Sequence, residues 1–136
     1  MEYRRTKTTV SKINYHFVFC PKYRRKIFKN KLVEWRFKEL VKEKCEKLDL
    51  EIIALECDLD HCHLFLNSPP SLSPQEIMAK LKGYTSHQLR KEFKELASCS
   101  SLWTRSYFVS TAGDMSTDTI KRYVENQKKN SKRKEN

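Results

Sequence analysis

The sequence predicts an α+β domain, and three observations support this class. Residues 10–20 place apolar side chains mainly on one parity and, near their end, on both, before a proline, which is typical of a buried strand. Residues 27–48 place apolar side chains at steps of three and four, which predicts a long amphipathic helix. Two short apolar runs, residues 51–57 and 61–67, are separated by three residues and predict a hairpin. The apolar positions expected to face inward from the first helix are Phe28, Leu32, Trp35, Leu40, Val41, Cys45 and Leu48.

The second half of the chain repeats a helix and a strand and then adds a helix. Ser73 and Glu76 form a capping-box pattern with Pro74 between them, which predicts a helix running to about residue 96. Residues 102–111 predict a fourth strand, and Ser116 can cap a last helix. The first six elements have the order of the ferredoxin-like split βαββαβ antiparallel sheet, with both helices on one face.

Composition limits the organisation and the partners of the chain. With 136 residues, we expect residues 1–136 to form a single domain, with a basic tail at 128–136 that frays. The formal net charge is +11, which favours a polyanionic partner, first of all nucleic acid, over a merely solubilising surface. No apolar run suits a membrane span and no signal peptide is evident. Five cysteines without a C-x-x-C pair indicate a reducing, cytoplasmic location.

His61-Cys62-His63 is the first group that could carry chemistry. Side chains at i and i+2 of a strand share a face, so both imidazoles could bind one metal ion while Cys62 turns into the core. Two ordinary, half-exposed histidines are the alternative, because the motif alone is short. A structural zinc site is disfavoured, since the remaining cysteines offer no second pair of ligands.

Tyr123 and Gln127 form a second group on the predicted last helix. They are four residues apart and therefore lie on one helical face. A phenol can act as a nucleophile, and a neighbouring amide oxygen can bind a metal ion. The alternative is a tyrosine that packs on the sheet beside a solvent-exposed glutamine.

A basic segment at residues 22–31 is the third feature, with six basic and no acidic side chains among ten. Such density suits contacts to phosphates, and interleaved aromatic rings offer surfaces for base stacking. Part of this charge could instead only solvate the start of the helix. The expected DNA contacts from this segment are Lys22, Tyr23, Arg24, Arg25 and Lys26.

Four motifs together resemble a known family. They are residues 15–25, the Asp60-His61-Cys62-His63-Leu64 segment, residues 81–86, and residues 107–111 followed by 120–127. In this order they resemble the single-tyrosine HUH transposases of small bacterial and archaeal insertion sequences, to which the REP-associated tyrosine transposases are related. The likeness covers nearly the whole chain.

This resemblance implies a metal-dependent DNA strand transferase that cuts and rejoins single-stranded DNA at hairpin-marked element ends. It implies Tyr123 as the nucleophile that forms a 5′-phosphotyrosine, and His61, His63 and Gln127 as metal ligands. It also implies a homodimer and Mg²⁺ or Mn²⁺ as the ion, although imidazoles accept softer ions. Three further basic residues expected to contact DNA are Lys82, Arg105 and Arg122.

A function from another class stays open at this point. Ferredoxin-like sheets also host non-catalytic modules that bind single-stranded DNA or RNA, and a fold alone does not fix function. Against such a module, no strand carries the aromatic signature of the RNA-recognition sheet.

Overall fold

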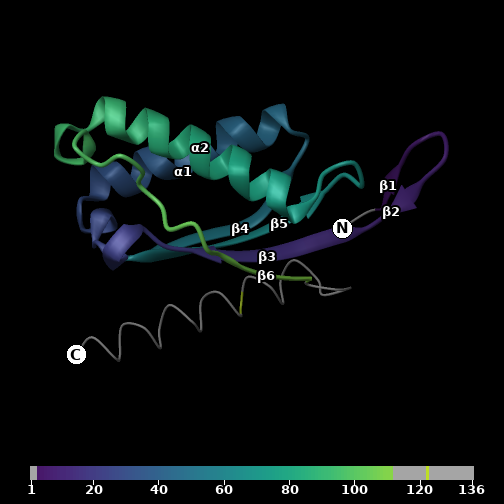
Figure 1. Cartoon of the computed structure of the whole chain (residues 1–136). Helices are drawn as coiled ribbons and strands as arrows, with labels where there is room; N and C mark the ends of the chain where they lie inside the picture. The colour runs from purple at the N-terminus through teal and green to yellow at the C-terminus, as the bar shows by residue number, and fades with distance from the viewer. Residues whose placement is uncertain (1–2, 112–121, 123–136) are drawn as a thin grey trace.

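The computed structural model describes residues 3–111 and residue 122. Its main sheet contains β3 (Ile13–Phe19), β4 (Glu51–Asp58), β5 (His61–Ser68) and β6 (Phe108–Thr111). The strands are antiparallel and lie in the order β4-β5-β3-β6. Two helices, α1 (Lys31–Lys47) and α2 (Pro74–Glu92), cover one face of this sheet (Figure 1). This is the ferredoxin-like order, and it confirms the predicted fold class.

Strand alternation separates a buried layer from an open layer. Phe17 and Phe19 of β3 and Cys62, Leu64 and Leu66 of β5 all belong to the core beneath the helices. Their neighbours in sequence point to the helix-free face of the sheet because successive side chains on a strand alternate. The five cysteines are free, as expected, and burial raises the pKa of the Cys45 thiol to about 12.

The first helix begins later than predicted, and this changes which residues face inward. Asn30 caps α1 by accepting a hydrogen bond from the backbone N–H of Leu32, so the helix starts at Lys31 and not at Ile27. Ile27–Lys29 form a separate 3₁₀ turn, η2, whose Phe28 is buried independently of the helix. The buried stripe of α1 is therefore Val33, Phe37, Leu40, Val41 and Cys45.

Leu32 and Trp35, expected to face inward, are in fact 67% and 61% exposed. Leu40, Val41 and Cys45 are buried as expected, so only the positions near the helix start, counted from Phe28 across the break at Asn30, were misplaced. In contrast, the capping box predicted for α2 is present, with Ser73 and Glu76 hydrogen-bonded reciprocally. That helix ends at Glu92, and a 3₁₀ turn, η3 (Lys94–Leu96), follows it.

The first and the last of the four predicted strands are shorter than the sequence indicates. Residues 10–20 divide into β3 and β2 (Val10–Ser11), and β2 pairs with β1 (Arg4–Arg5) in a small projecting ribbon (Figure 1). Of residues 102–111, only β6 is a strand, while Trp103 makes an isolated bridge to Pro21. Neither helix within residues 3–111 combines the length and apolar character needed to cross a bilayer.

The phase of α1 generates a paired prediction on stability. Replacing Phe37, which is fully buried, by Ala should lower the free energy of unfolding by about 3–5 kcal/mol, because the change leaves a cavity. Replacing exposed Trp35 by Ala should change it by no more than about 0.5 kcal/mol. Urea denaturation followed by circular dichroism measures both values. Equal losses for the two variants would contradict the phase.

Candidate functional site

The histidine pair lies on β5 at the helix-free face of the sheet. His61 and His63 are half-buried, and their ring centroids are 5.2 Å apart. Cys62 between them is fully buried in the core and pairs in register with Phe19 of β3. The alternation of β5 thus brings the two imidazoles to one surface and turns the thiol away from it.

A carboxylate joins the two imidazoles. Asp58 ends β4 and pairs across the hairpin with His61, and its Oδ2 lies 2.9 Å from Nε2 of His61. Ligand atoms of Asp58, His61 and His63 all lie within 4.8 Å of one another. Two imidazoles and a carboxylate are donors that many divalent ions accept, so these residues fit a divalent cation. The sequence analysis missed Asp58, although its place just before the hairpin turn could have indicated it.

Asp60 holds His61 from its other nitrogen. Its Oδ1 lies 2.9 Å from Nδ1 of His61, and its Oδ2 lies 3.3 Å from Nε of Arg24. Burial opposes ionisation of Asp60, but the hydrogen bond with His61 and the positive charge of Arg24 outweigh it and lower the pKa of the carboxyl. An Asp60 carboxylate that accepts from Nδ1–H leaves Nε2 of His61 as the nitrogen that can bind a metal ion.

His16 of β3 plays the corresponding part for His63. Nε2 of His16 lies 3.1 Å from Nδ1 of His63, and its ring stacks on Phe65 with centroids 4.0 Å apart. Burial, and then the neighbouring His63, lower the pKa of His16 to about 4, so this imidazole is neutral at pH 7. Burial, and then His61, also lower the pKa of His63. A neutral His16 can accept from Nδ1–H of His63 and so direct Nε2 of His63 to a cation.

Several predicted site residues lie outside the described residues. These are Tyr123 and Gln127, together with the predicted last helix and the tail at 128–136. Arg122, a predicted DNA contact, is exposed.

The basic loop after β3 is held in an unusual backbone conformation. Lys22–Arg24 form a 3₁₀ turn, η1, in which Tyr23 and Arg24 both adopt positive φ, 60° and 50°. Such left-handed residues other than glycine are uncommon. The conformation leaves the ring of Tyr23 91% exposed while Arg24 reaches Asp60. The loop therefore connects predicted DNA contacts directly to the histidine pair.

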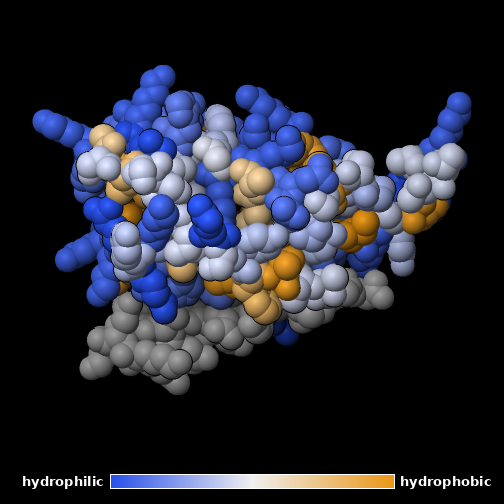
Figure 2. Space-filling model, in the orientation of Figure 1, coloured by the Kyte–Doolittle hydropathy of each residue, from blue (hydrophilic) through white to orange (hydrophobic). Residues whose placement is uncertain are grey.

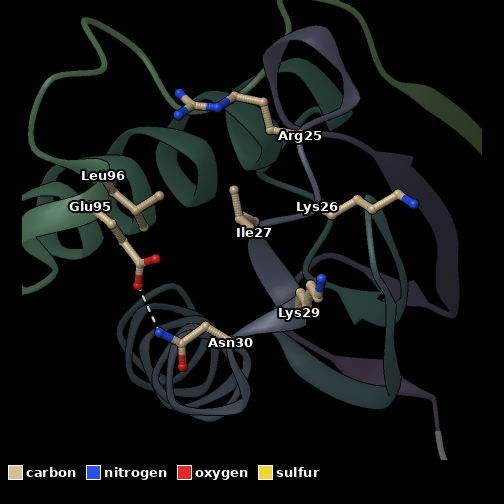
Figure 3. Close-up of a pocket in the computed structure, with 7 residues that line it drawn as sticks. All are labelled: Arg25, Lys26, Ile27, Lys29, Asn30, Glu95 and Leu96. Atoms are coloured by element: carbon tan, nitrogen blue, oxygen red, sulfur yellow. Dashed lines mark hydrogen bonds between the residues drawn. The ribbon is translucent and has the colours of Figure 1, made fainter.

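Arg25 and Lys26 point away from each other and line a hollow of about 450 Å³ (Figure 3). Nη1 of Arg25 donates to Sγ of Cys99 at 2.7 Å. Lys29 adds a third cation, while Glu95 accepts a hydrogen bond from Asn30 across the opening. The face of the molecule seen in the orientation of Figure 1 is mostly hydrophilic (Figure 2).

Lys82, in the middle of α2, lies beside Arg105, which precedes β6. The ammonium of half-buried Lys82 donates to the carbonyl oxygens of Thr104 and Ser106 at 2.8 and 3.0 Å, and to that of Arg105 at 3.4 Å. Burial lowers the pKa of Lys82. Arg105 is exposed. Lys82 thereby holds the segment that leads into β6.

Comparisons with known proteins agree on one class. A crystal structure of a putative transposase from Deinococcus radiodurans superposes with a TM-score of 0.74 at 27% identity, over 91% of this chain and 97% of that one. A REP-associated tyrosine transposase bound to a REP hairpin has the same fold, with a TM-score of 0.61 at 13% identity over 91% of this chain and 68% of that one. Both of these structural relatives are described as transposases.

Sequence relatives identify the family within that class. The chain is 35% identical to the transposase for insertion sequence element IS200 of Salmonella typhimurium, over 83% of this chain and 75% of the relative. It is 25% identical to the ISDra2 transposase TnpA of Deinococcus radiodurans, over 93% and 92% respectively. The family described as "Transposase IS200 like" matches residues 9–127. The chain belongs to the IS200-like transposase family.

The contacts of Lys82 generate a prediction on local dynamics. Lys82→Met keeps the aliphatic stem but removes the donors, so three backbone carbonyls lose a hydrogen-bond partner. Amide hydrogen exchange across residues 104–108 should become at least roughly tenfold faster, while exchange in α1 stays unchanged. Unaltered exchange at 104–108 would show that the ammonium does not hold this segment.

Proposed function

We propose that this transposase cleaves and rejoins single-stranded DNA at hairpin-marked element ends through a 5′-phosphotyrosine on Tyr123. The observation that supports this most is the convergence of His61, His63 and Asp58 at the open sheet face of a chain from the IS200-like family. A fold relative bound to a REP hairpin supports the choice of a hairpin substrate. The net charge of +11 suits a polyanion.

Each step exchanges one phosphate ester bond for another, so the number of these bonds does not change. The Tyr123 oxygen attacks the phosphorus, a tyrosine O–P bond forms, and the bond from phosphorus to the 3′ oxygen breaks. The phenol loses its proton to water, and the leaving 3′ oxygen gains one to become a hydroxyl. Attack of a 3′ hydroxyl on the phosphotyrosine reverses these steps and rejoins a strand without an external energy source.

Metal binding is proposed at the histidine pair, with Gln127 as the expected further ligand and Mg²⁺ or Mn²⁺ as the ion. Asp58 offers a carboxylate oxygen at the same place. A cation bound here would polarise a non-bridging oxygen of the scissile phosphate. Asp60 and His16 orient the two imidazoles through their Nδ1 atoms.

DNA contacts are proposed for Lys22, Tyr23, Arg24, Arg25, Lys26, Lys82, Arg105 and Arg122. Of these, Arg24 lies beside His61 through its ion pair with Asp60, and Lys82 acts at least in part through the backbone it holds. We also propose that residues 1–136 act as one domain within a homodimer. Five free cysteines and a DNA substrate support a cytoplasmic location.

The nucleophile is tested by replacing Tyr123 with Phe. Cleavage of a labelled hairpin substrate with its single-stranded flank should fall by roughly 10³-fold or more, and the covalent adduct seen by mass spectrometry should disappear. Binding of the same DNA should persist. Exposed Tyr3→Phe is the matched control and should cleave normally. Cleavage that survives in Tyr123→Phe would reject the assignment, and wild-type binding without any cleavage would favour a non-catalytic module.

The metal site is tested by calorimetric titration with MnCl₂. His61→Ala should abolish Mn²⁺ binding, and Asp60→Asn should weaken it by roughly 10- to 100-fold, because Asp60 orients His61. Glu51→Gln, an exposed carboxylate at the far end of β4, is the matched control and should bind Mn²⁺ as the wild type does. Retained Mn²⁺ affinity in a folded His61→Ala protein would contradict the site.

A further inference from the structure

A second hollow, separate from the one in Figure 3, opens beside His61 of the histidine pair. Its volume is about 470 Å³, within the usual range of ~300–1,000 Å³ for small-ligand clefts. The lining residues are Val18, Phe19, Cys20, Arg24, His61, Ser106, Tyr107 and Phe108. It therefore includes one of the two histidines, one guanidinium and two aromatic rings outside the core.

Phe108 gives this hollow a large apolar wall. It is 54% exposed on the helix-free face, and it touches His16 edge-on with ring centroids 5.8 Å apart. The exposed ring lines the hollow, so a planar group that enters the hollow can stack on it. Tyr107 differs, because its ring lies against Phe17 and beneath the ammonium of Lys82.

The strand register places Phe108 level with the histidines. Val18 of β3 pairs with His63 on one side and with Phe108 on the other. These three residues form one row across β5, β3 and β6, so Phe108 lies two strand spacings, about 10 Å, from His63. The row puts a stacking surface next to the place where the scissile phosphate is proposed to bind.

Arg24 supplies a positive charge in the lining of the same hollow. Its ion pair with Asp60 uses Nε, and a guanidinium carries five N–H donors in all. The Arg24 side chain is 67% exposed even with that ion pair formed. The hollow thus combines an anchored cation with an aromatic face, which is the pairing that holds single-stranded nucleic acid.

We propose that this hollow binds one unpaired nucleotide that flanks the phosphate to be cut, with its base stacked on Phe108 and its phosphate held by Arg24. The inference rests on the proposed action on single-stranded DNA. It assigns a role to Phe108, which the sequence motifs did not. Stacking does not read hydrogen-bonding edges, so the subsite selects for an unpaired base and tolerates different bases.

The test is a binding scan in the Tyr123→Phe protein, which keeps the DNA intact. Hairpin oligonucleotides with a single-stranded flank carry one abasic site at each unpaired position in turn, and the dissociation constant is measured for each. One position should weaken binding by roughly 5- to 150-fold when the base is missing. Adding Phe108→Ala should remove that dependence, and Phe108→Tyr should restore it.

Trp35→Ala on α1 is the matched control, because it removes an equally exposed aromatic ring from the opposite side of the sheet. It should keep the dependence on the abasic position. If Phe108→Ala responds to every abasic site as the parent does, or if no single position stands out, the subsite is wrong. If the wild type does not cleave the DNA but one abasic position still weakens binding in a manner that depends on Phe108, only the proposed function is contradicted. Normal cleavage without a position that depends on Phe108 contradicts only the subsite.

Discussion

The site depends on one constraint: β5 lies between two strands, and its successive side chains point to opposite faces of the sheet. β5 is paired along its length with β3 and with β4, so a register slip of one residue would exchange its faces. Such a slip would bury both imidazoles under the helices and expose Cys62, Leu64 and Leu66. The free-energy cost of exposing these apolar side chains keeps the histidines on the open face. The core therefore specifies the site geometry as much as the polar residues do.

Around the histidine pair, each imidazole is oriented by a partner on a neighbouring segment. Asp60 belongs to the hairpin turn and His16 to β3, so the two rings are supported independently. The carboxylates of Asp58 and Asp60 lie at His61, whereas the neutral His16 and Phe65 surround His63. Negative charge is thus concentrated at one end of the site, nearest to Arg24 and the basic loop.

Sequence periodicity was sufficient for the order of the first six predicted elements, for the capping of α2 and for the shared face of His61 and His63. It failed where tertiary contacts decide. Asn30 ends one local structure and begins another, so a single helical count across it misplaced Leu32 and Trp35. Asp58 and His16 were missed because each gains its role only through cross-strand pairing, which is set by register. The exposure of Phe108 beside the histidines could not be predicted for the same reason, since nothing local distinguishes it from a core strand residue.

The left-handed backbone conformations of Tyr23 and Arg24 affect the stability of the fold. Each such residue costs of order 1–3 kcal/mol relative to an unstrained backbone, and glycine would avoid most of that cost. A glycine at either place would, however, give up the solvent-facing ring or the tie to Asp60. The loop therefore keeps a strained backbone in order to display two side chains. Selection for a more stable fold and selection for a working loop should favour different residues at these two positions.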